Sequence, residues 1–199
     1  MTICNIKKLI DLKNWNSIIK DNSPKDICCV LNFDQIMHLI EKMFYENMQD
    51  DQIQQFALNL AFETRNYFRN QWEIDWKNDV FLGHLCCVLW RYKDQYICYK
   101  KAYDKLTDPP ESILLLLAGC DNIPSILNHQ KIEKYLKSAL EKKITYEGAL
   151  MMKALYHHKT DLQMETYWDN MCTELLNKNI HTETIIPDVL MKSGEQFHT

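Results

Sequence analysis

The stretch FDQIMHLIEKMFYENMQDDQIQQFALNLAFETRNYF, residues 33–68, decides the fold class. Apolar residues recur three and four positions apart in its first half, and again in its second half after a polar break at residues 49–51. Such spacing lines the apolar side chains along one side of an α-helix. The first stripe is Phe33, Ile36, Met37, Ile40, Met43 and Phe44, and the second is Ile53, Phe56, Ala57, Leu60, Ala61, Thr64, Tyr67 and Phe68. The stretch therefore predicts a helical hairpin.

The rest of the chain shows helical signals and none of the usual β-hairpin turns. Glycine occurs only four times, and neither Asn-Gly nor Asp-Gly is present, although these dipeptides are typical of β-hairpins. Short polar residues that can cap a first helical turn mark the clearest helix starts, at residues 23–26, 32–35, 108–111 and 160–163. We expect an all-α fold of antiparallel helical hairpins, forming a compact bundle or a short degenerate helical-repeat array.

The segment from Leu82 to Pro110 resembles a tetratricopeptide repeat. The residues that carry this resemblance are Leu82, Gly83, Tyr92, Tyr99, Ala102 and the Pro109–Pro110 pair. In such a repeat, small residues let two antiparallel helices approach closely and aromatic residues fill the space to the next hairpin. The segment departs from the pattern where Asp79 replaces a large apolar residue, Gln95 replaces a small one, and Pro109 falls late.

A weaker echo of this pattern follows 36 residues later. Gly119, Tyr135 and Lys137 stand opposite Gly83, Tyr99 and Lys101, and a third helix pair is expected to begin near Gly148. Between these points Ile132, Tyr135, Leu136, Ala139 and Leu140 form another apolar stripe, opposite lysines that face solvent. The resemblance implies stacked helix pairs, whether they form a true superhelix or a bundle.

Length and hydropathy favour one soluble domain. A chain of 199 residues can close one good core, so we expect a single domain over residues 1–199, with a flexible C-terminal tail from about residue 188. No stretch approaches the roughly 20 apolar residues of a membrane helix. Charged residues Lys7, Lys8, Asp11 and Lys13 interrupt the N-terminal apolar residues, unlike a secretory signal. We therefore expect a cytoplasmic protein that does not bind membranes.

Charge and cysteine spacing argue against three further classes. The net charge of −4 argues against a nucleic-acid binder, which needs a basic surface for phosphates. The eight cysteines contain no C-x-x-C pair, so neither a zinc ribbon nor a thioredoxin-like redox site is indicated. Most of them lie beside Ile, Val or Leu, and we expect reduced thiols buried in the core.

Sequence motifs for catalysis are absent. The chain contains no glycine-rich phosphate loop and no G-x-S-x-G nucleophile turn, and we expect no catalytic residue, cofactor or metal. The nearest approaches to metal sites are the pairs His38 with Glu41, His84 with Cys87, and Glu195 with His198. Each is a single pair, whereas a metal site needs three or four ligands. Residues His157 and His158 are expected to end a helix rather than to act as a base.

One acidic and aromatic cluster is the candidate partner-binding surface. Residues 44–79 hold seven acidic and three basic residues, and the cluster within them comprises Trp72, Glu73, Asp75, Trp76 and Asp79. Aromatic anchors among acids suit a basic protein partner. The alternative is that Trp72 and Trp76, four residues apart, are the core stripe of one helix.

These observations favour a non-catalytic protein that binds another protein. The most concrete hypothesis is a bacterial immunity protein that neutralises a toxin, with a basic toxin domain as the partner; it rests on class analogy. One alternative is an all-helical enzyme or a small-ligand or metal-binding protein, with a site assembled from distant residues such as His38, Glu41 and His84. Another is a repeat-type scaffold or adaptor that holds an extended peptide.

Overall fold

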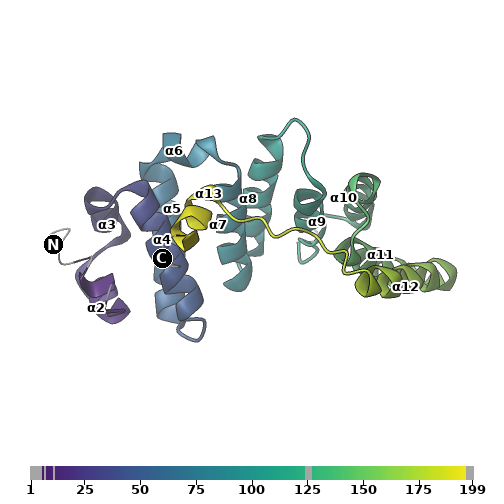
Figure 1. The fold of residues 1–199 in the computed structure, drawn as a ribbon, viewed down its shortest axis with the longest axis horizontal. Helices are drawn as coiled ribbons and strands as arrows, with labels where there is room; N and C mark the ends of the chain where they lie inside the picture. The colour runs from purple at the N-terminus through teal and green to yellow at the C-terminus, as the bar shows by residue number, and fades with distance from the viewer. Residues whose placement is uncertain (1–5, 7, 11, 124–126, 196–199) are drawn as a thin grey trace. The chain divides into compact units, whose positions relative to one another are not determined.

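The computed structural model describes residues 6, 8–10, 12–123 and 127–195, and this part of the chain is helical without a β-strand (Figure 1). The all-α prediction is confirmed. The backbone divides into two compact units, unit 1 (Met1–Arg91 with Ile186–Thr199) and unit 2 (Tyr92–Ile185). The single domain and the flexible tail stay predictions, and each unit is described by itself. None of the described helices combines the length and apolar character of a membrane crossing.

Unit 1 is built around the hairpin that residues 33–68 predict. Its helices are α2 (Trp15–Asp21), α3 (Pro24–Val30), α4 (Phe33–Glu46), α5 (Asp51–Tyr67), α6 (Arg69–Ile74), α7 (Lys77–Val88) and α13 (Asp188–Glu195). Helix α4 packs along α5, and α3 also packs against α5. Both predicted caps form capping boxes, Ser23 with Asp26 and Asn32 with Gln35.

The core of unit 1 contains a tryptophan that is held by a hydrogen bond. The Trp72 indole is fully buried and lies edge-on to Phe33, with ring centres 6.3 Å apart. Its Nε1 donates to Oδ1 of the buried Asp79 over 3.0 Å. The indole N–H therefore finds an acceptor away from water, as a buried polar group requires. This bond ties α6 to the first turns of α7.

Helix α13 belongs to unit 1, although it lies at the far end of the sequence. It packs against α4, and Leu190 is buried. Lys77 at the start of α7 forms an ion pair of 2.7 Å with Asp188. The backbone N–H of Asp188 also donates to Oδ2 of Asp75 over 3.4 Å. The turn between α6 and α7 is thus the point where the C-terminal helix is fixed.

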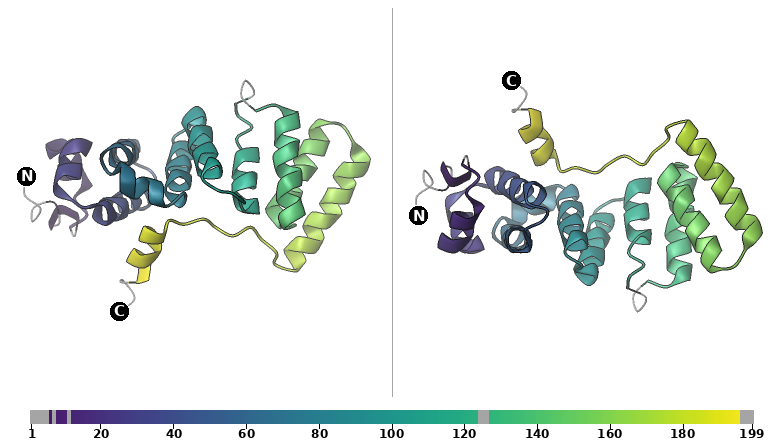
Figure 2. Two further views of the ribbon diagram at one scale, coloured as in Figure 1. Left: turned by 90° about the horizontal axis from the view of Figure 1, so that it is seen from above. Right: turned by 90° about the horizontal axis from the view of Figure 1, so that it is seen from below.

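Unit 2 consists of successive helices packed side by side (Figure 2). They are α8 (Tyr92–Asp104), α9 (Glu111–Ala118), α10 (His129–Lys142), α11 (Tyr146–His158) and α12 (Leu162–Asn177). Helices α9 and α10 form one hairpin and α11 and α12 the next, and α10 packs against α11. These are the helix pairs that the echo near Gly119 and Gly148 predicts.

The two helix starts that the sequence predicts in unit 2 differ in their chemistry. Asp161 caps α12 by accepting from the N–H of Met164 over 3.1 Å. Asp108 does not cap α9, because the first turn of α9 follows Pro110 and has no side-chain cap. The Asp108 carboxylate pairs instead with Lys142 of α10. Proline at the N-cap cannot accept a first-turn N–H with its side chain, so α9 begins without the cap that the sequence predicts.

Close packing in unit 2 depends on a glycine. A Cβ built on Gly148 of α11 would lie 3.1 Å from Cδ2 of Leu140 and 3.5 Å from Cδ2 of Leu115. The missing side chain lets α11 approach α9 and α10, which is the role that small residues play in helical repeats. The core beneath includes Leu136 and Ala139, both fully buried.

The tetratricopeptide-like segment spans the boundary between the units. Its first helix is α7 and its second is α8, and Gly83, Tyr99 and Ala102 are all buried as the pattern expects. Asp79, the departure from the pattern, is the acceptor for the Trp72 indole, which explains a carboxylate in an apolar position. The packing of a true repeat at this segment stays a prediction, because α7 and α8 lie in different units.

Candidate functional site

The structure separates the residues of the predicted partner surface. Trp72 and Asp79 are buried and bonded to each other, so neither presents a side chain at the surface of unit 1. Helix α6 ends at Ile74 and α7 begins at Lys77, so Trp72 and Trp76 do not lie on one helix. The alternative of a single helical core stripe is therefore wrong, although Trp72 itself does belong to the core.

Three members of the predicted surface remain accessible. Glu73 is exposed, whereas Asp75 and Trp76 are half-buried. The Asp75 carboxylate already accepts two backbone N–H groups, that of Lys77 over 2.9 Å at Oδ1 and that of Asp188 over 3.4 Å at Oδ2. Asp75 therefore has a structural use at the start of α7. Partner binding at this cluster stays a prediction, and Glu73 is its most accessible acid.

The residues of the alternative enzyme or metal hypothesis do not form a cluster of three. His38 and Glu41 pair on α4 with Nδ1 and Oε2 3.6 Å apart. Burial lowers the pKa of His38 and of His84, and burial raises the pKa of Glu41. Among the described residues, no three His, Cys, Asp or Glu side chains come together as metal ligands would. The Glu195 and His198 pair lies partly outside the described residues.

Five of the seven described cysteines are buried, as predicted, and none of the seven forms a disulfide. Cys29 and Cys87 are exposed, so the prediction is wrong for these two thiols. Burial raises the pKa of Cys28 to about 11, and burial also raises the pKa of Cys87 and Cys172. A raised pKa keeps a thiol protonated and a poor nucleophile. Cys4 lies outside the described residues.

A hollow of about 830 Å³ on unit 1 is the candidate binding site, and we name it the Trp90 hollow. Its wall is formed by α2, the α4–α5 turn, α5 and the end of α7. The apolar lining residues are Ile19, Met48, Phe56, Val88, Leu89 and Trp90. Three of them remain largely exposed: Trp90 by 78%, Met48 by 63% and Val88 by 42%. Large apolar side chains gathered at an open hollow indicate an interaction surface.

Trp90 is held in an unfavourable backbone conformation. Two backbone hydrogen bonds end helix α7. The N–H of Arg91 donates to the carbonyl of Cys86 over 2.8 Å, and the N–H of Trp90 donates to the carbonyl of Cys87 over 3.1 Å. This termination places Trp90 at a φ of 60°, a left-handed position that normally takes glycine. The Arg91 guanidinium lies 5.0 Å from the ring centre of Phe62 on α5, which fixes the turn that follows.

Amide side chains form the polar part of the lining. They are Gln52, Gln54, Gln55 and Asn59, together with the carboxylate of Asp51. Gln55 donates to Asn59 over 3.1 Å, and both side chains are exposed. Gln54 is buried, and its Nε2 has no hydrogen-bond partner among the described residues. Amides donate and accept equally, which matches the alternating groups of a polypeptide backbone.

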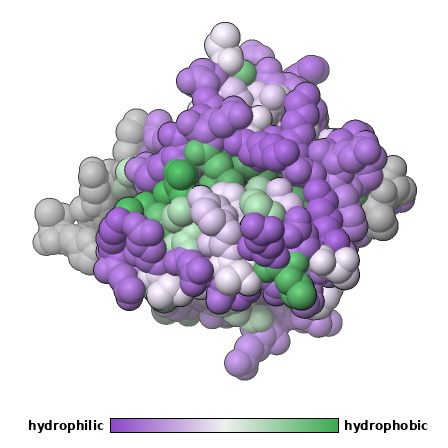
Figure 3. All heavy atoms as spheres, turned by 90° about the vertical axis from the view of Figure 1, so that its right-hand side faces the viewer, coloured by the Kyte–Doolittle hydropathy of each residue, from purple (hydrophilic) through white to green (hydrophobic). Residues whose placement is uncertain are grey.

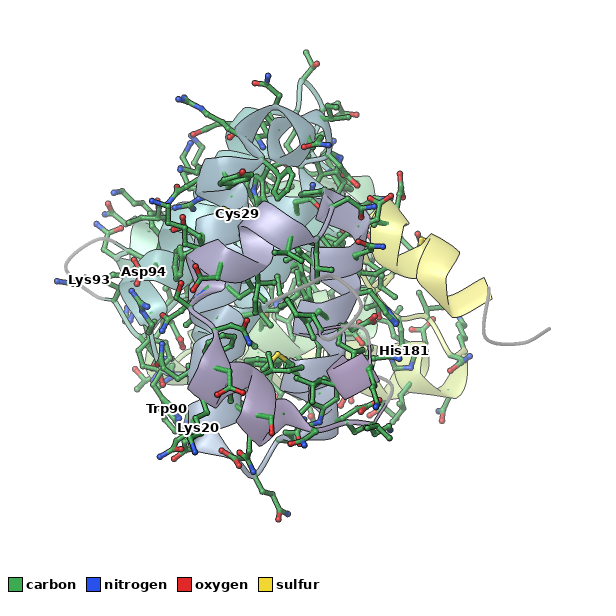
Figure 4. All side chains as sticks on the ribbon, turned by 90° about the vertical axis from the view of Figure 1, so that its left-hand side faces the viewer. Lys20, Cys29, Trp90, Lys93, Asp94 and His181 are labelled. Carbon is green, nitrogen blue, oxygen red and sulfur yellow. The ribbon has the colours of Figure 1, made fainter. Side chains whose placement is uncertain are left out.

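Charged residues surround the hollow unequally. Glu46, Asp50 and Asp51 lie at the α4–α5 turn, although Asp50 also caps α5. Figure 4 labels Lys20 and Trp90 at the same edge of the view, and Lys20 does not line the hollow. Acidic residues outnumber basic ones over unit 1 as a whole. The field around the hollow therefore favours a basic ligand.

One feature of the sequence indicates exposed apolar residues at this hollow, although helical periodicity alone does not predict it. Residues 85–90 read LCCVLW, and six consecutive apolar residues cannot all face one side of a helix. Some of them must therefore reach the surface. Their convergence with Met48 and Ile19 depends on tertiary packing, which the spacing of residues along the chain does not encode.

Comparison of the chain with models of protein families, with curated proteins and with solved structures finds no match. The geometry of the Trp90 hollow is therefore the basis for the function proposed below.

Proposed function

We propose that the protein is a non-catalytic binding protein that holds a partner protein at the Trp90 hollow. The observation that carries the proposal is Trp90, which is 78% exposed and sits in a left-handed backbone position. Exposure and left-handed strain both cost free energy in the protein alone. A partner that covers the indole removes the cost of exposure, and tryptophan is among the residues that contribute most to interfaces.

The shape and chemistry of the hollow favour a peptide segment of that partner. A space of about 830 Å³ accommodates several side chains. The apolar wall of Met48, Val88 and Trp90 suits an apolar anchor residue, and the amides of Gln52 and Gln55 suit the backbone on either side of it.

The charge around the hollow favours a basic segment. Asp51 lines the hollow, so lysine or arginine beside the anchor residue gains electrostatic attraction, whereas Glu46 at the same turn is already paired with Lys13 over 3.1 Å. Rim charges act mainly on the rate of association and on specificity. We therefore infer an apolar anchor flanked by basic residues, in agreement with the basic partner expected from the sequence.

A random peptide library selected against the full chain tests this proposal. We expect enriched peptides to contain an aromatic or large aliphatic residue next to lysine or arginine. Bound to isotope-labelled protein, they should shift the NMR signals of the Trp90 indole N–H and of the side-chain NH₂ groups of Gln55 and Asn59. Trp90→Ala should weaken binding at least about tenfold, since interface tryptophans commonly cost more than about 2 kcal/mol on truncation.

Two further variants distinguish a local effect from a general one. Ile74→Ala removes an apolar side chain that is 83% exposed outside the hollow, and should leave the affinity unchanged. Gln55→Met keeps the length of the side chain and removes an exposed amide of the lining, and should weaken binding without unfolding the chain. Enrichment of acidic peptides, or equal binding by Trp90→Ala and wild type, would contradict the proposal.

The narrower form of the proposal is a bacterial immunity protein whose partner is a toxin. It is supported only by the mildly acidic charge of −4 and by the acidic surroundings of the hollow. Co-expression with the protein encoded by the adjacent gene tests it. Protection of growth by the wild-type chain and loss of protection with Trp90→Ala is the expected result. The adaptor function is favoured instead if the protein encoded by the adjacent gene is not toxic, or if the partner binds through an unfolded peptide segment alone.

A further inference from the structure

A second hollow lies within unit 2, where α9, α10 and α11 meet, and we name it the His129 hollow. It encloses about 690 Å³, within the size range of small-molecule sites. Its deep wall is apolar, since Leu127, Leu136 and Leu155 line it and are each at most 5% exposed. Met151 adds a flexible side chain that adapts to the shape of a ligand. Figure 3 shows apolar atoms at the surface of unit 2, surrounded by polar ones.

Two imidazoles stand together in the lining of this hollow. The rings of His129, at the start of α10, and His158, at the end of α11, are nearly parallel, with centres 6.3 Å apart. Both residues are exposed. Every imidazole offers at least one N–H donor in either charge state. An imidazole N–H lies in the plane of its ring, so a carboxylate oxygen, which accepts at about 2.8 Å, reaches these donors at the exposed edges of the two rings.

The surrounding charges favour an anion over a cation at this point. The first turn of α10 presents the positive end of the helix dipole, and Lys131 lies in that turn. Helix α10 carries more lysine than glutamate. Asp121 is the acidic residue of the lining and opposes an anion. The two imidazoles count here as N–H donors and not as charges, so the helix start and Lys131 stand against one carboxylate.

From this arrangement we propose that the His129 hollow binds a single-chain amphiphile whose apolar tail lies against Leu136 and Leu155 and whose carboxylate is held by His129 and His158. The proposal is independent of the partner at the Trp90 hollow, because it concerns a different unit. The apolar wall supplies affinity and the imidazole pair supplies selection for the carboxylate.

Decanoate and decanol are probes that differ only in the head group, so they test the proposal directly. With methyl-labelled methionine in the full chain, both should shift the Met151 signal, whereas that of Met43 in the core of unit 1 should not move. We expect decanoate to bind at least tenfold more tightly than decanol. The double variant His129→Phe with His158→Phe keeps two planar rings without an N–H donor, and should remove this preference and leave decanol binding within twofold.

Matched variants make each outcome decisive. His157→Gln changes a neighbouring histidine that pairs with Glu165 and does not line the hollow, so both affinities should stay the same. Asp121→Asn should strengthen decanoate binding alone. Ala154→Trp fills the hollow from an exposed lining position and should abolish binding of both probes. Equal affinities for the two probes in wild type, tighter binding of decyltrimethylammonium, or an unmoved Met151 signal would overturn the proposal.

Discussion

Helices α7 in unit 1 and α11 in unit 2 end in the same way but use the last turn differently. At the end of α11 the N–H of Asp161 bonds to the carbonyl of Tyr156, and Thr160 between them has a φ of 56°. At the end of α7 the N–H of Arg91 bonds in the same way to the carbonyl of Cys86, and Trp90 has a φ of 60°. Thr160 turns its hydroxyl onto the carbonyl of Lys159 over 2.7 Å and does not line the His129 hollow. Trp90 forms part of the wall of its own hollow.

The two units differ in whether the strained backbone position lies in the wall of the hollow. In unit 2 the strained residue lies outside the hollow, and the lining residue His158 belongs to the helix proper. In unit 1 strain and exposure fall on the same side chain. Strain of this kind persists where the surrounding structure fixes it, and it concentrates at functional positions. We therefore expect changes at the end of α7 to exchange stability for binding, and changes at the end of α11 not to do so.

The largest expected effect is at the start of α7, which positions Trp90 at its other end. Asp79→Ala removes the acceptor of the buried Trp72 indole and leaves a cavity, at a cost of about 2–4 kcal/mol in the free energy of unfolding of unit 1. Hydrogen exchange should accelerate in α6 and α7 and stay unchanged in α11 and α12. Asp79→Asn keeps an acceptor oxygen and should cost less.

Equal acceleration in both units after Asp79→Ala would break the comparison, because it would show that unit 1 and unit 2 unfold together. The domain prediction of one unit over residues 1–199 would then be supported. Faster exchange in α6 and α7 alone would show two independent units.

The converse change acts on unit 2. Gly148→Val places branched atoms where a Cβ alone already approaches Leu140 within 3.1 Å. Overpacking of this kind costs about 1–3 kcal/mol, so we expect unit 2 to lose about 2 kcal/mol while the peptide affinity of the Trp90 hollow stays the same. Urea denaturation followed by the NMR signal of the Trp168 indole N–H, in the core of unit 2, measures the loss. An unchanged midpoint would show that α11 can move away from α10.

The hairpins could be predicted from sequence, and the hollows could not, for a physical reason. Stripes such as Ile36 to Met43 record which side of a helix is buried, and local caps such as Ser23 record where it begins. The sequence predicts a surface position for Trp72 and Asp79, because the helix break at Asp75 has no glycine or proline to mark it. Whether an aromatic or acidic residue faces water then depends on the angle between two helices.

Removing the strain at the two helix ends should stabilise both units by a smaller amount. A left-handed position costs a non-glycine residue about 1–2 kcal/mol, so Trp90→Gly and Thr160→Gly should each raise the free energy of unfolding by about 1 kcal/mol. Asn179→Gly, at a third such end, should gain less because asparagine tolerates this conformation. Urea denaturation of the three variants measures these gains.

Peptide binding separates the same variants. Trp90→Gly should lose the affinity of the Trp90 hollow for its selected peptides, whereas Thr160→Gly and Asn179→Gly should keep it. If Trp90→Gly lowers the free energy of unfolding, packing of the indole stabilises the chain by more than the left-handed backbone position destabilises it. Trp90 is then a structural residue like Trp72.

The smallest expected effect concerns the start of α11, where the chain after α12 is fastened. Glu147 accepts at Oε1 from His181 and at Oε2 from the N–H of Thr182, both over 2.8 Å. Partial burial by itself raises the pKa of Glu147, but these hydrogen bonds outweigh it and hold the pKa below its ordinary value. The stabilisation is thus fully present above the ordinary pKa of a glutamate and is lost as the pH falls through the lowered pKa.

Comparison of wild type with Glu147→Gln isolates this contribution. Because the Glu147 side chain is 41% exposed, the difference in stability should be below about 1 kcal/mol near neutral pH and should disappear as the pH falls through the lowered pKa of Glu147. Urea midpoints of the two proteins at several pH values measure it, with the exposed Glu141→Gln as a control that should show no such trend. A difference that does not change with pH would assign the effect to packing. The start of α11 would then hold its partner segment by shape rather than by charge.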